Sequence, residues 1–197
     1  MAMAFDAFSD ASDEALLVAF GNGDGEAAAV LTARLAPRVL GFAARILGGD
    51  RAEAEDVTQE AMLRLWKIAP EWRQGEAKVT TWLYRVTSNL CTDRLRKRRH
   101  VDIDAIPEPV DDTPGAAAGM MRASRADALQ AALAQLPERQ RIAVTLRHLE
   151  GRTNPEIAEV LEISVEAVES LTARGKRALA ALLRPRREEL GYVEDRS

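Results

Sequence analysis

The chain has 197 residues, enough for one or two small domains, and its composition of 47% hydrophobic and 29% charged residues is that of an ordinary globular protein. One cysteine and two histidines exclude a disulfide framework within the chain and fall short of the usual zinc sites, so we expect no metal and no cofactor. The net charge of −4 is unevenly distributed along the chain. Residues 64–100 carry ten basic and three acidic side chains, whereas residues 1–63 carry four basic and eleven acidic ones. The basic block predicts a local contact with nucleic acid.

The first third of the chain is predicted to be helical after a disordered start. Residues 1–12 are small and acidic without a period, and three helices are expected over residues 13–20, 26–47 and 50–68. The third helix has an apolar stripe formed by Ala54, Val57, Ala61, Leu65 and Ile68. We expect neither a membrane span nor a secretory signal, because the longest early apolar run is short and follows acidic residues, and we therefore expect a cytoplasmic protein.

Residues 80–100, TTWLYRVTSNLCTDRLRKRRH, are the most informative stretch. As a helix, this stretch has an apolar stripe formed by Val79, Trp82, Leu83, Val86, Leu90 and, less squarely, Leu95. The opposite side carries Arg85, Asn89, Asp93, Arg96 and Arg99. Five cations within six residues are more than a helix dipole needs, so the pattern favours a nucleic-acid backbone over a solvated surface helix. Cys91 lies near the apolar side, and we interpret it as a core residue, not a redox thiol.

The composition changes at residues 101–121, which contain five acidic side chains, no basic side chain and several prolines and glycines. Like charges and prolines keep a segment extended, so we interpret this one as a flexible linker. It would separate a first domain, residues 1–100, from a second domain, residues 122–197. The sequence therefore predicts an all-α fold of two helical domains joined by a flexible acidic linker.

The second domain is predicted to contain four helices, over about residues 122–136, 137–149, 154–161 and 165–183. Thr153 and Glu156 form a capping box at the start of the third helix, and a turn of about three residues separates it from the fourth. Two helices joined by so short a turn, the second one longer, have the sequence form of a helix-turn-helix. The chain shows no phosphate loop and no Ser/His/Asp arrangement, so no catalytic residue is expected and the protein is predicted not to be an enzyme.

Two stretches resemble a known family. DVTQEAMLRLWK followed by TTWLYRVTSNLCTDRLRKRR is similar to the second conserved region of bacterial extracytoplasmic-function (ECF, group IV) sigma factors, and LPERQRIAVTLRHLEGRTNPEIAEVLEISVEAVESLTARGKRAL is similar to the fourth. The resemblance covers about residues 16–183 and looks most like the alphaproteobacterial sigma-E group, which is associated with singlet-oxygen stress and a zinc-containing anti-sigma partner. It implies an alternative sigma factor that directs core RNA polymerase to stress-response promoters and is held inactive by an anti-sigma factor.

The resemblance implies roles for the first domain. The helix over residues 50–68 would dock on the clamp helices of the polymerase β′ subunit through Asp56, Gln59, Glu60 and Arg64, and the β subunit is a further expected partner of the chain. The alternative is that these four side chains only solvate a surface helix.

Asn89 aligns with an asparagine that reads a flipped-out base of the −10 element, and its amide could offer a donor and an acceptor to a base edge. The alternative to base reading is that the Asn89 side chain only forms a local hydrogen bond on the helix surface. The loop over residues 72–79 would wall the base pocket. The other −10 contacts would come from Arg85, Arg94, Arg96, Lys97, Arg98, Arg99 and Trp72. Trp82 could stack on a base, but its place on the apolar stripe favours core packing.

In the second domain, the resemblance implies that the helix from Val165 enters the major groove of the −35 element. Its outward residues would be Glu166, Glu169, Ser170, Ala173, Arg174 and Arg177. Many relatives carry a basic residue where Glu169 stands and another where Leu171 stands. Glutamate can accept a hydrogen bond from a cytosine amino group and leucine can meet a thymine methyl group, so we expect a −35 sequence unlike the family's usual one.

Two other classes of protein fit parts of the sequence. A helix-turn-helix regulator that acts without replacing the polymerase sigma subunit would leave the tryptophan-rich first domain unexplained. A DNA-modifying enzyme would need a metal or nucleophile constellation that the sequence lacks. Co-purification with core polymerase separates a sigma factor from both alternatives.

Overall fold

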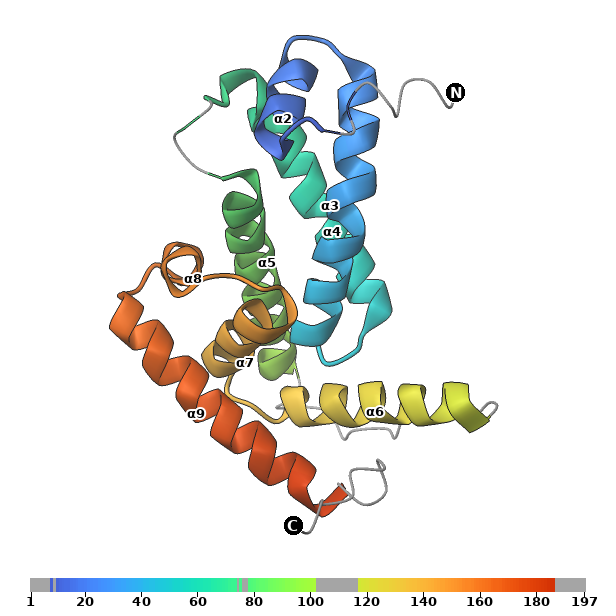
Figure 1. Ribbon diagram of the computed structural model, residues 1–197, viewed down its shortest axis with the longest axis vertical. Helices are drawn as coiled ribbons and strands as arrows, with labels where there is room; N and C mark the ends of the chain where they lie inside the picture. Colours follow the sequence, from blue (N-terminus) through green and yellow to red (C-terminus); the bar gives the residue numbers. More distant parts are fainter. Residues whose placement is uncertain (1–7, 9, 74, 76–77, 102–116, 187–197) are drawn as a thin grey trace.

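The computed structural model describes residues 8, 10–73, 75, 78–101 and 117–186, and every regular element within them is a helix (Figure 1). The all-α prediction is therefore confirmed. In chain order the elements are α2 (Asp13–Gly21), α3 (Gly25–Ile46), α4 (Arg51–Ile68), the 3-10 turn η1 (Ala69–Glu71), α5 (Val79–Val101), α6 (Ala117–Ala134), α7 (Glu138–Val144), the π-helical turn η2 (Thr145–Leu149), α8 (Asn154–Leu161), α9 (Val165–Leu183) and the 3-10 turn η3 (Arg184–Arg186).

The first three helices begin close to where the sequence predicts, because short polar side chains cap them. Ser12, Asp24 and Asp50 each accept hydrogen bonds from backbone N–H groups in the first turn of α2, α3 and α4 respectively. Such caps satisfy donors that a helix N-terminus cannot pair internally. Most of the predicted disordered start, residues 1–7 and residue 9, lies outside the described residues.

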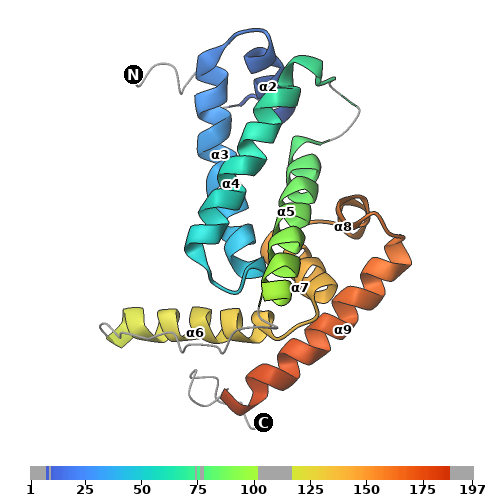
Figure 2. The ribbon, with the colours of Figure 1, turned by 180° about the vertical axis from the view of Figure 1, so that it is seen from behind.

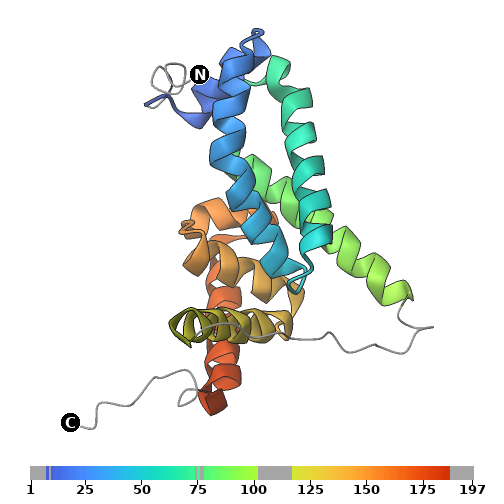
Figure 3. The same cartoon turned by 90° about the vertical axis from the view of Figure 1, so that its right-hand side faces the viewer.

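Helix α3 is the core helix of the first half. It runs beside α4 and also contacts α2 and α5 (Figures 1 and 3). Its apolar side chains Leu31, Leu35, Phe42 and Ile46 are buried. By length and composition alone, α3 could also cross a membrane. Because these side chains are instead covered by neighbouring helices, we interpret α3 as the core helix of a globular domain.

Helix α5 is buried on two sides, since it packs against α3 and α4 and also against α8 of the second half (Figure 2). The predicted stripe contributes the buried residues Val79, Leu83 and Leu90, but Tyr84 and Ser88 are buried as well. The buried surface is wider than the sequence predicts because a second set of helices covers a neighbouring face. Cys91 is fully buried, and desolvation raises the pKa of its thiol to about 12, so it is the inert core residue that was expected.

The helix-turn-helix predicted in the second half is present as α8 and α9. Thr153 and Glu156 form the predicted capping box, each accepting a hydrogen bond from the other's backbone N–H. Glu162 ends α8 in the left-handed conformation with φ of 53°, and Ser164 caps α9. Helix α9 then passes close to α7 at Gly175, where an added Cβ would lie 2.5 Å from Val144 Cγ2.

Helix α6 lies across the end of α3 (Figure 1), and the amide of Gln130 donates to the carbonyl oxygens of Ala44 and Arg45. Most of the segment predicted as a linker, residues 102–116, lies outside the described residues. At its two ends, α5 extends to Val101 and α6 begins at Ala117, before the expected residue 122.

The two halves pack directly against each other, which the sequence did not predict. Buried Leu146 and Ile157 of the second half belong to the same hydrophobic cluster as Leu83 of α5. Arg141 of α7 is almost completely buried, and its guanidinium donates to the carbonyl oxygen of Ile46 at the end of α3. A shared core and a buried cation bonded across the boundary hold the halves in one arrangement.

Candidate nucleic-acid interface

The cationic end of α5 is the first part of the candidate interface, and two of its arginines are held by α4. Arg94 pairs with Glu53 at 3.2 Å, and Arg98 pairs with Asp50 at 2.5 Å. The backbone N–H of Glu53, and to a lesser extent the Arg98 guanidinium, lower the pKa of Asp50, so its carboxylate stays charged. These two arginines fasten α5 to α4, a role that sequence reasoning did not assign to them.

The remaining cations of this end differ in their partners. Arg96 pairs with Asp93 one turn earlier on the exposed surface, and Arg99 pairs with Glu138 of α7 at 2.7 Å. Lys97 is exposed and forms no ion pair within the described part of the chain. Arg96, Lys97 and Arg99 are therefore the exposed cations of the predicted backbone-binding run.

Asn89 and Arg85 lie on the solvent side of α5, as predicted. Asn89 is exposed and makes no hydrogen bond to another described residue. Arg85 lies 3.7 Å from Glu162 and lines a cavity of about 280 Å³ with Thr81, Trp82, Glu159 and Glu162. The predicted base-reading amide is thus free, while the arginine one turn before it faces acidic groups of the second half.

Two tryptophans lie at the start of α5. Trp72 packs edge-on against Trp82, with ring centroids 6.4 Å apart. The indole N–H of Trp72 is buried and has no acceptor among the described residues. Trp82 is half-buried and packs against the core, which agrees with core packing as its main role. The predicted loop wall over residues 72–79 is described only in part, since residues 74, 76 and 77 lie outside the described residues.

Helix α9 carries the residues predicted for the −35 element. Its exposed residues are Glu166, Glu169, Ser170, Ala173, Arg174 and Arg177, the six that the sequence placed outward. Leu171 is different, because it is half-buried and packs against the hydrophobic core between α8 and α9. Its methyl groups already have apolar neighbours, so Leu171 is less suited than the six to meet a thymine.

The face of α4 predicted to dock on polymerase is accessible. Asp56, Gln59 and Arg64 are exposed, and Glu60 forms an ion pair with Arg64. Beside them an apolar groove of about 500 Å³ runs between α3 and α4, lined by Thr32, Ala36, Pro37, Leu40, Glu55, Thr58, Gln59, Met62, Leu63 and Trp66. Leu63 is 55% exposed in this groove. Sequence reasoning missed Leu63, although its position off the apolar stripe of α4 was the available signal.

The structure also brings together residues that the sequence did not connect. Four glutamates of the second half contact polar side chains of the first half: Glu138, Glu150, Glu156 and Glu162. No group of three metal-ligating side chains occurs in the described part of the chain. The arrangement therefore presents charged, amide and aromatic groups for binding, in two sets carried by α5 and α9.

Comparisons with known proteins agree with this division. The family model of sigma-70 region 2 matches residues 31–101, and that of sigma-70 region 4 matches residues 126–179. The ECF RNA polymerase sigma factor SigE of Mycolicibacterium smegmatis is 34% identical to this chain over 177 residues, which cover 85% of this chain and 68% of that protein. The RNA polymerase sigma-H factor of Pseudomonas aeruginosa is 30% identical, with 88% of this chain and 94% of that protein covered.

Two solved structures are similar to the described fold. CnrH, in complex with the cytosolic domain of CnrY, is 26% identical with a TM-score of 0.65, and the match covers 88% of this chain and 97% of CnrH. The sigma factor RpoE of Bartonella quintana, in complex with the anti-sigma factor NepR, has a TM-score of 0.63 at 23% identity, with 78% of this chain and 94% of RpoE covered.

Proposed function

This chain belongs to the ECF sigma factors of bacterial RNA polymerase, and from that premise we propose that α5 reads and opens the −10 element while α9 reads the −35 element. Asn89 carries the proposal. It is exposed, it lies one turn after Arg85, and its amide is committed to no other described residue. An amide in that state can bond a base edge without first breaking a bond inside the protein.

We infer a division of labour along the chain, with residues 1–100 serving polymerase docking and the −10 element, residues 101–121 serving as a linker, and residues 122–197 serving the −35 element. The two matched regions, 31–101 and 126–179, support it because the intervening residues belong to neither. The relatives that the chain matches are transcription initiation factors, and we propose that this chain likewise carries out no covalent chemistry. It would act in the cytoplasm, where polymerase and DNA are.

Core polymerase is proposed to bind the outward face of α4 through the β′ clamp helices, with the β subunit as a further partner of the chain. The support is a surface that combines polar side chains at Asp56, Gln59 and Arg64 with the apolar groove around Leu63. An exposed leucine at the rim of an apolar groove, ringed by polar groups, is typical of a protein interface. Charge reversals at Asp56 and Glu60 should weaken this binding.

The −10 backbone contacts are proposed to come from Arg85, Arg96, Lys97 and Arg99, with Arg94 and Arg98 acting mainly through α4. The −35 contacts are proposed to come from Glu166, Glu169, Ser170, Ala173, Arg174 and Arg177. Because Glu169 repels phosphate, we propose that it accepts a hydrogen bond from a base. Trp72 is proposed to bound the base pocket through its packing on Trp82.

We further propose that an anti-sigma factor holds the chain inactive by covering the outward face of α4, so that it and polymerase exclude each other. CnrH, a structural relative, is bound to the cytosolic domain of CnrY. The narrower placement in the alphaproteobacterial sigma-E group, with singlet-oxygen stress and a zinc-containing partner, stays a prediction from the sequence motifs. A stable ternary complex of polymerase, this chain and its inhibitor would contradict the exclusion.

Run-off transcription with purified core polymerase on a randomised promoter library tests the proposed function. We expect the chain to confer selective initiation on one class of paired −35 and −10 sequences. Core polymerase alone is the control. Specific duplex binding by the chain without any stimulation of initiation would favour the helix-turn-helix regulator instead.

A further inference from the structure

A cavity between α5 and the end of α8 is built by both halves of the chain. Its volume is about 280 Å³, and it is lined by Thr81, Trp82, Arg85, Glu159 and Glu162. Pockets that hold ligands usually have volumes of about 300–1,000 Å³, so this cavity suits a molecule of a few non-hydrogen atoms. The lining combines a hydroxyl, an indole and three charged groups, so we examine which small molecule these groups fit.

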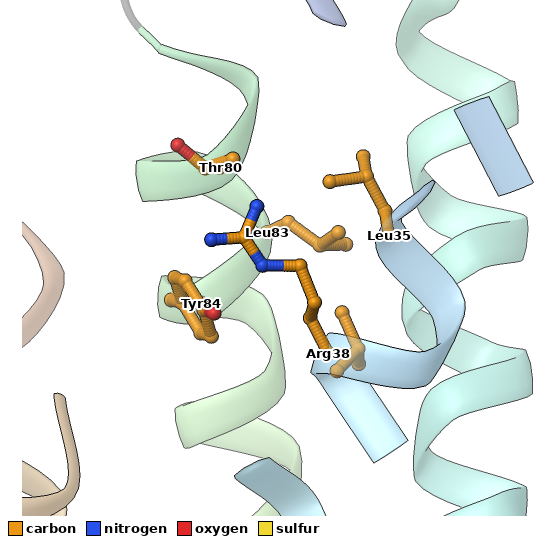
Figure 4. A pocket seen from close by; sticks show the side chains of 6 residues that line it. Leu35, Arg38, Thr80, Leu83 and Tyr84 are labelled. Atoms are coloured by element: carbon orange, nitrogen blue, oxygen red, sulfur yellow. The ribbon is translucent and has the colours of Figure 1, made fainter. Parts of the chain in front are cut away.

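The pocket on the other side of α5, towards α3, is too small for such a molecule. It is lined by Leu35, Arg38, Val39, Thr80, Leu83 and Tyr84, and its volume of about 10 Å³ has room for about one water. Figure 4 shows the Arg38 guanidinium extending from α3 towards Thr80 and Tyr84. The groove beside α4 is larger, but the proposed function already assigns it to polymerase. The cavity between α5 and α8 therefore combines sufficient volume with polar groups that mostly have no assigned role.

The charges that line this cavity favour a cation. Two carboxylates and one guanidinium give the lining a net charge of −1. Arg85 lies 3.7 Å from Glu162, which offsets the charge of that carboxylate but is too far for a hydrogen bond. Glu159 is exposed and pairs with no other described residue. Both glutamates stand at the C-terminal end of α8, where the helix dipole also favours positive charge.

Thr81 and Trp82 add a hydrogen-bonding group and an aromatic surface. Thr81 is only 5% exposed, and its hydroxyl has no hydrogen-bond partner among the described residues. The hydroxyl and methyl groups of threonine exchange places by rotation about χ1, so the hydroxyl can turn to the cavity and accept from a ligand N–H there. Trp82 lies beside it in the wall, and indole is the aromatic group that attracts cations most strongly.

We propose that this cavity binds a small primary alkylammonium, with the ammonium between Glu159 and Glu162 and the alkyl chain against Trp82. An ammonium has three N–H donors and no acceptor, which matches two carboxylates and the Thr81 hydroxyl. The site goes beyond the proposed function, because no proposed promoter contact requires it. A ligand that touches α5 and α8 together binds while both surround it, so it stabilises this arrangement of the folded chain by mass action.

Isothermal titration calorimetry and thermal unfolding of the full chain with butylammonium chloride test the site. 1-Butanol is the neutral control with the same alkyl chain, and potassium chloride at equal concentration controls for ionic strength. We expect saturable binding of butylammonium but not of 1-butanol, and a rise in melting temperature that follows its occupancy and that potassium chloride does not reproduce. Absence of saturation, or equal effects from 1-butanol or potassium chloride, would overturn the proposal.

A charge-matched pair of variants locates the ammonium. Glu159→Gln keeps the shape of the side chain and removes the unpaired carboxylate, so butylammonium should bind about tenfold more weakly, as for the loss of a charged hydrogen bond. Glu26→Gln removes the same charge at an exposed position at the start of α3 and should leave the affinity unchanged. Circular dichroism checks the helical content of both variants. Wild-type affinity in Glu159→Gln would overturn the proposal.

Thr81→Val replaces the unpartnered hydroxyl by a methyl group of similar size. No hydrogen bond within the described chain is lost, so the melting temperature of the ligand-free protein should not fall, whereas butylammonium should bind about fivefold more weakly. A lower melting temperature together with unchanged affinity would show that the hydroxyl serves the fold instead of the ligand, and would overturn the proposed contact.

Discussion

Helices α5 and α9 are the two elements proposed to face promoter DNA, and they differ in how far their polar groups are already occupied. On α5, Arg94 and Arg98 pair with carboxylates of α4, and Arg99 pairs with Glu138 of the second half. On α9, Arg174 donates to the carbonyl oxygen of Ser170 in its own helix and to no other described residue, and its neighbours on that face are exposed. The comparison shows that the polar face of α9 is exposed in this arrangement, whereas much of the cationic end of α5 is already paired with carboxylates of the chain.

The largest effect is expected from breaking the support of α9. In Gly175→Ala, the new Cβ would lie 2.5 Å from Val144 Cγ2 and 3.3 Å from the carbonyl oxygen of Gln140, so α9 must move away from α7. We expect a loss of about 2–3 kcal/mol in the free energy of unfolding, the usual cost of overpacking. Chemical denaturation measures it. Gly25→Ala is the matched control, because nothing lies within 4 Å of a Cβ there, and equal destabilisation of both variants would contradict the close approach.

The next effect concerns the free amide on α5. Asn89→Ala should reduce −10 discrimination by about 1–3 kcal/mol, the contribution of a bidentate base contact, and should impair promoter opening. Its exposure predicts a change in unfolding free energy within about 0.5 kcal/mol. Permanganate footprinting on consensus and substituted −10 templates measures promoter opening and −10 discrimination, with core-polymerase binding as the control. Unchanged opening on both templates would count against the role of Asn89.

A third pair of variants separates the structural cations of α5 from the accessible ones. Arg94→Ala leaves Glu53 without its guanidinium partner and should lower the unfolding free energy by about 1 kcal/mol. Lys97→Ala should leave stability unchanged and weaken single-strand binding, since Lys97 is exposed. Thermal unfolding and a salt titration of strand binding measure the two effects. If Arg94→Ala left stability unchanged and Lys97→Ala lowered it, the pairing of Arg94 with Glu53 would not hold in solution.

On α9, Glu169→Arg should shift −35 preference without abolishing binding. The side chain is exposed and sits between Glu166 and Arg174 on the outward face, so replacing an acceptor by a donor changes which base edge it can meet. We expect a shift of about 1 kcal/mol between the preferred sequences of the two proteins. Selection from a −35 library measures this shift. If both proteins ranked the −35 sequences in the same order, Glu169 would not contribute to −35 recognition.

The smallest effect is a pH dependence of the stability that the contacts of Glu156 contribute. The pKa of Glu156 is lowered from 4.5 to about 2 in the folded chain, so the stabilisation from its contacts is complete above pH 4.5 and is lost as the pH falls towards 2. In Glu156→Gln this titration is removed, so its stability should fall less than that of wild type over this window. We expect a difference below about 1 kcal/mol, because the partner Lys78 is exposed. Parallel acid titrations followed by circular dichroism measure it.

Local patterns in the sequence predicted most of the helices, whereas the packing of the halves was not predictable. The capping box at Thr153 and Glu156 and the cap at Asp50 are decided by neighbours within one turn, so the helix starts were predictable. The contact of Glu150 with Tyr84 joins residues 66 positions apart and depends on the π-helical turn, which no local pattern signals. A charge pattern alone cannot tell whether an arginine will meet a phosphate or a carboxylate.

The candidate site shows the same limit residue by residue. Asn89 was placed correctly because helical periodicity alone decides which side of α5 it occupies. Arg94 and Arg98 were assigned to the DNA backbone, but they pair with Glu53 of α4 and with its N-cap Asp50, which only the tertiary packing determines. Leu171 was assigned to the −35 contacts, although the neighbouring core takes up part of its side chain.

Glu162 combines a strained backbone with a contact across the boundary between the two halves. A left-handed φ of 53° costs a residue with a Cβ about 1 kcal/mol, a cost that glycine would avoid. Glycine at this position would make the turn of the helix-turn-helix easier to form but would remove the carboxylate that faces Arg85. The chain therefore carries a small conformational penalty at the turn that joins α9, the proposed −35 helix, to the boundary with α5. Engineering this turn for thermal stability would also remove one contact between the two halves.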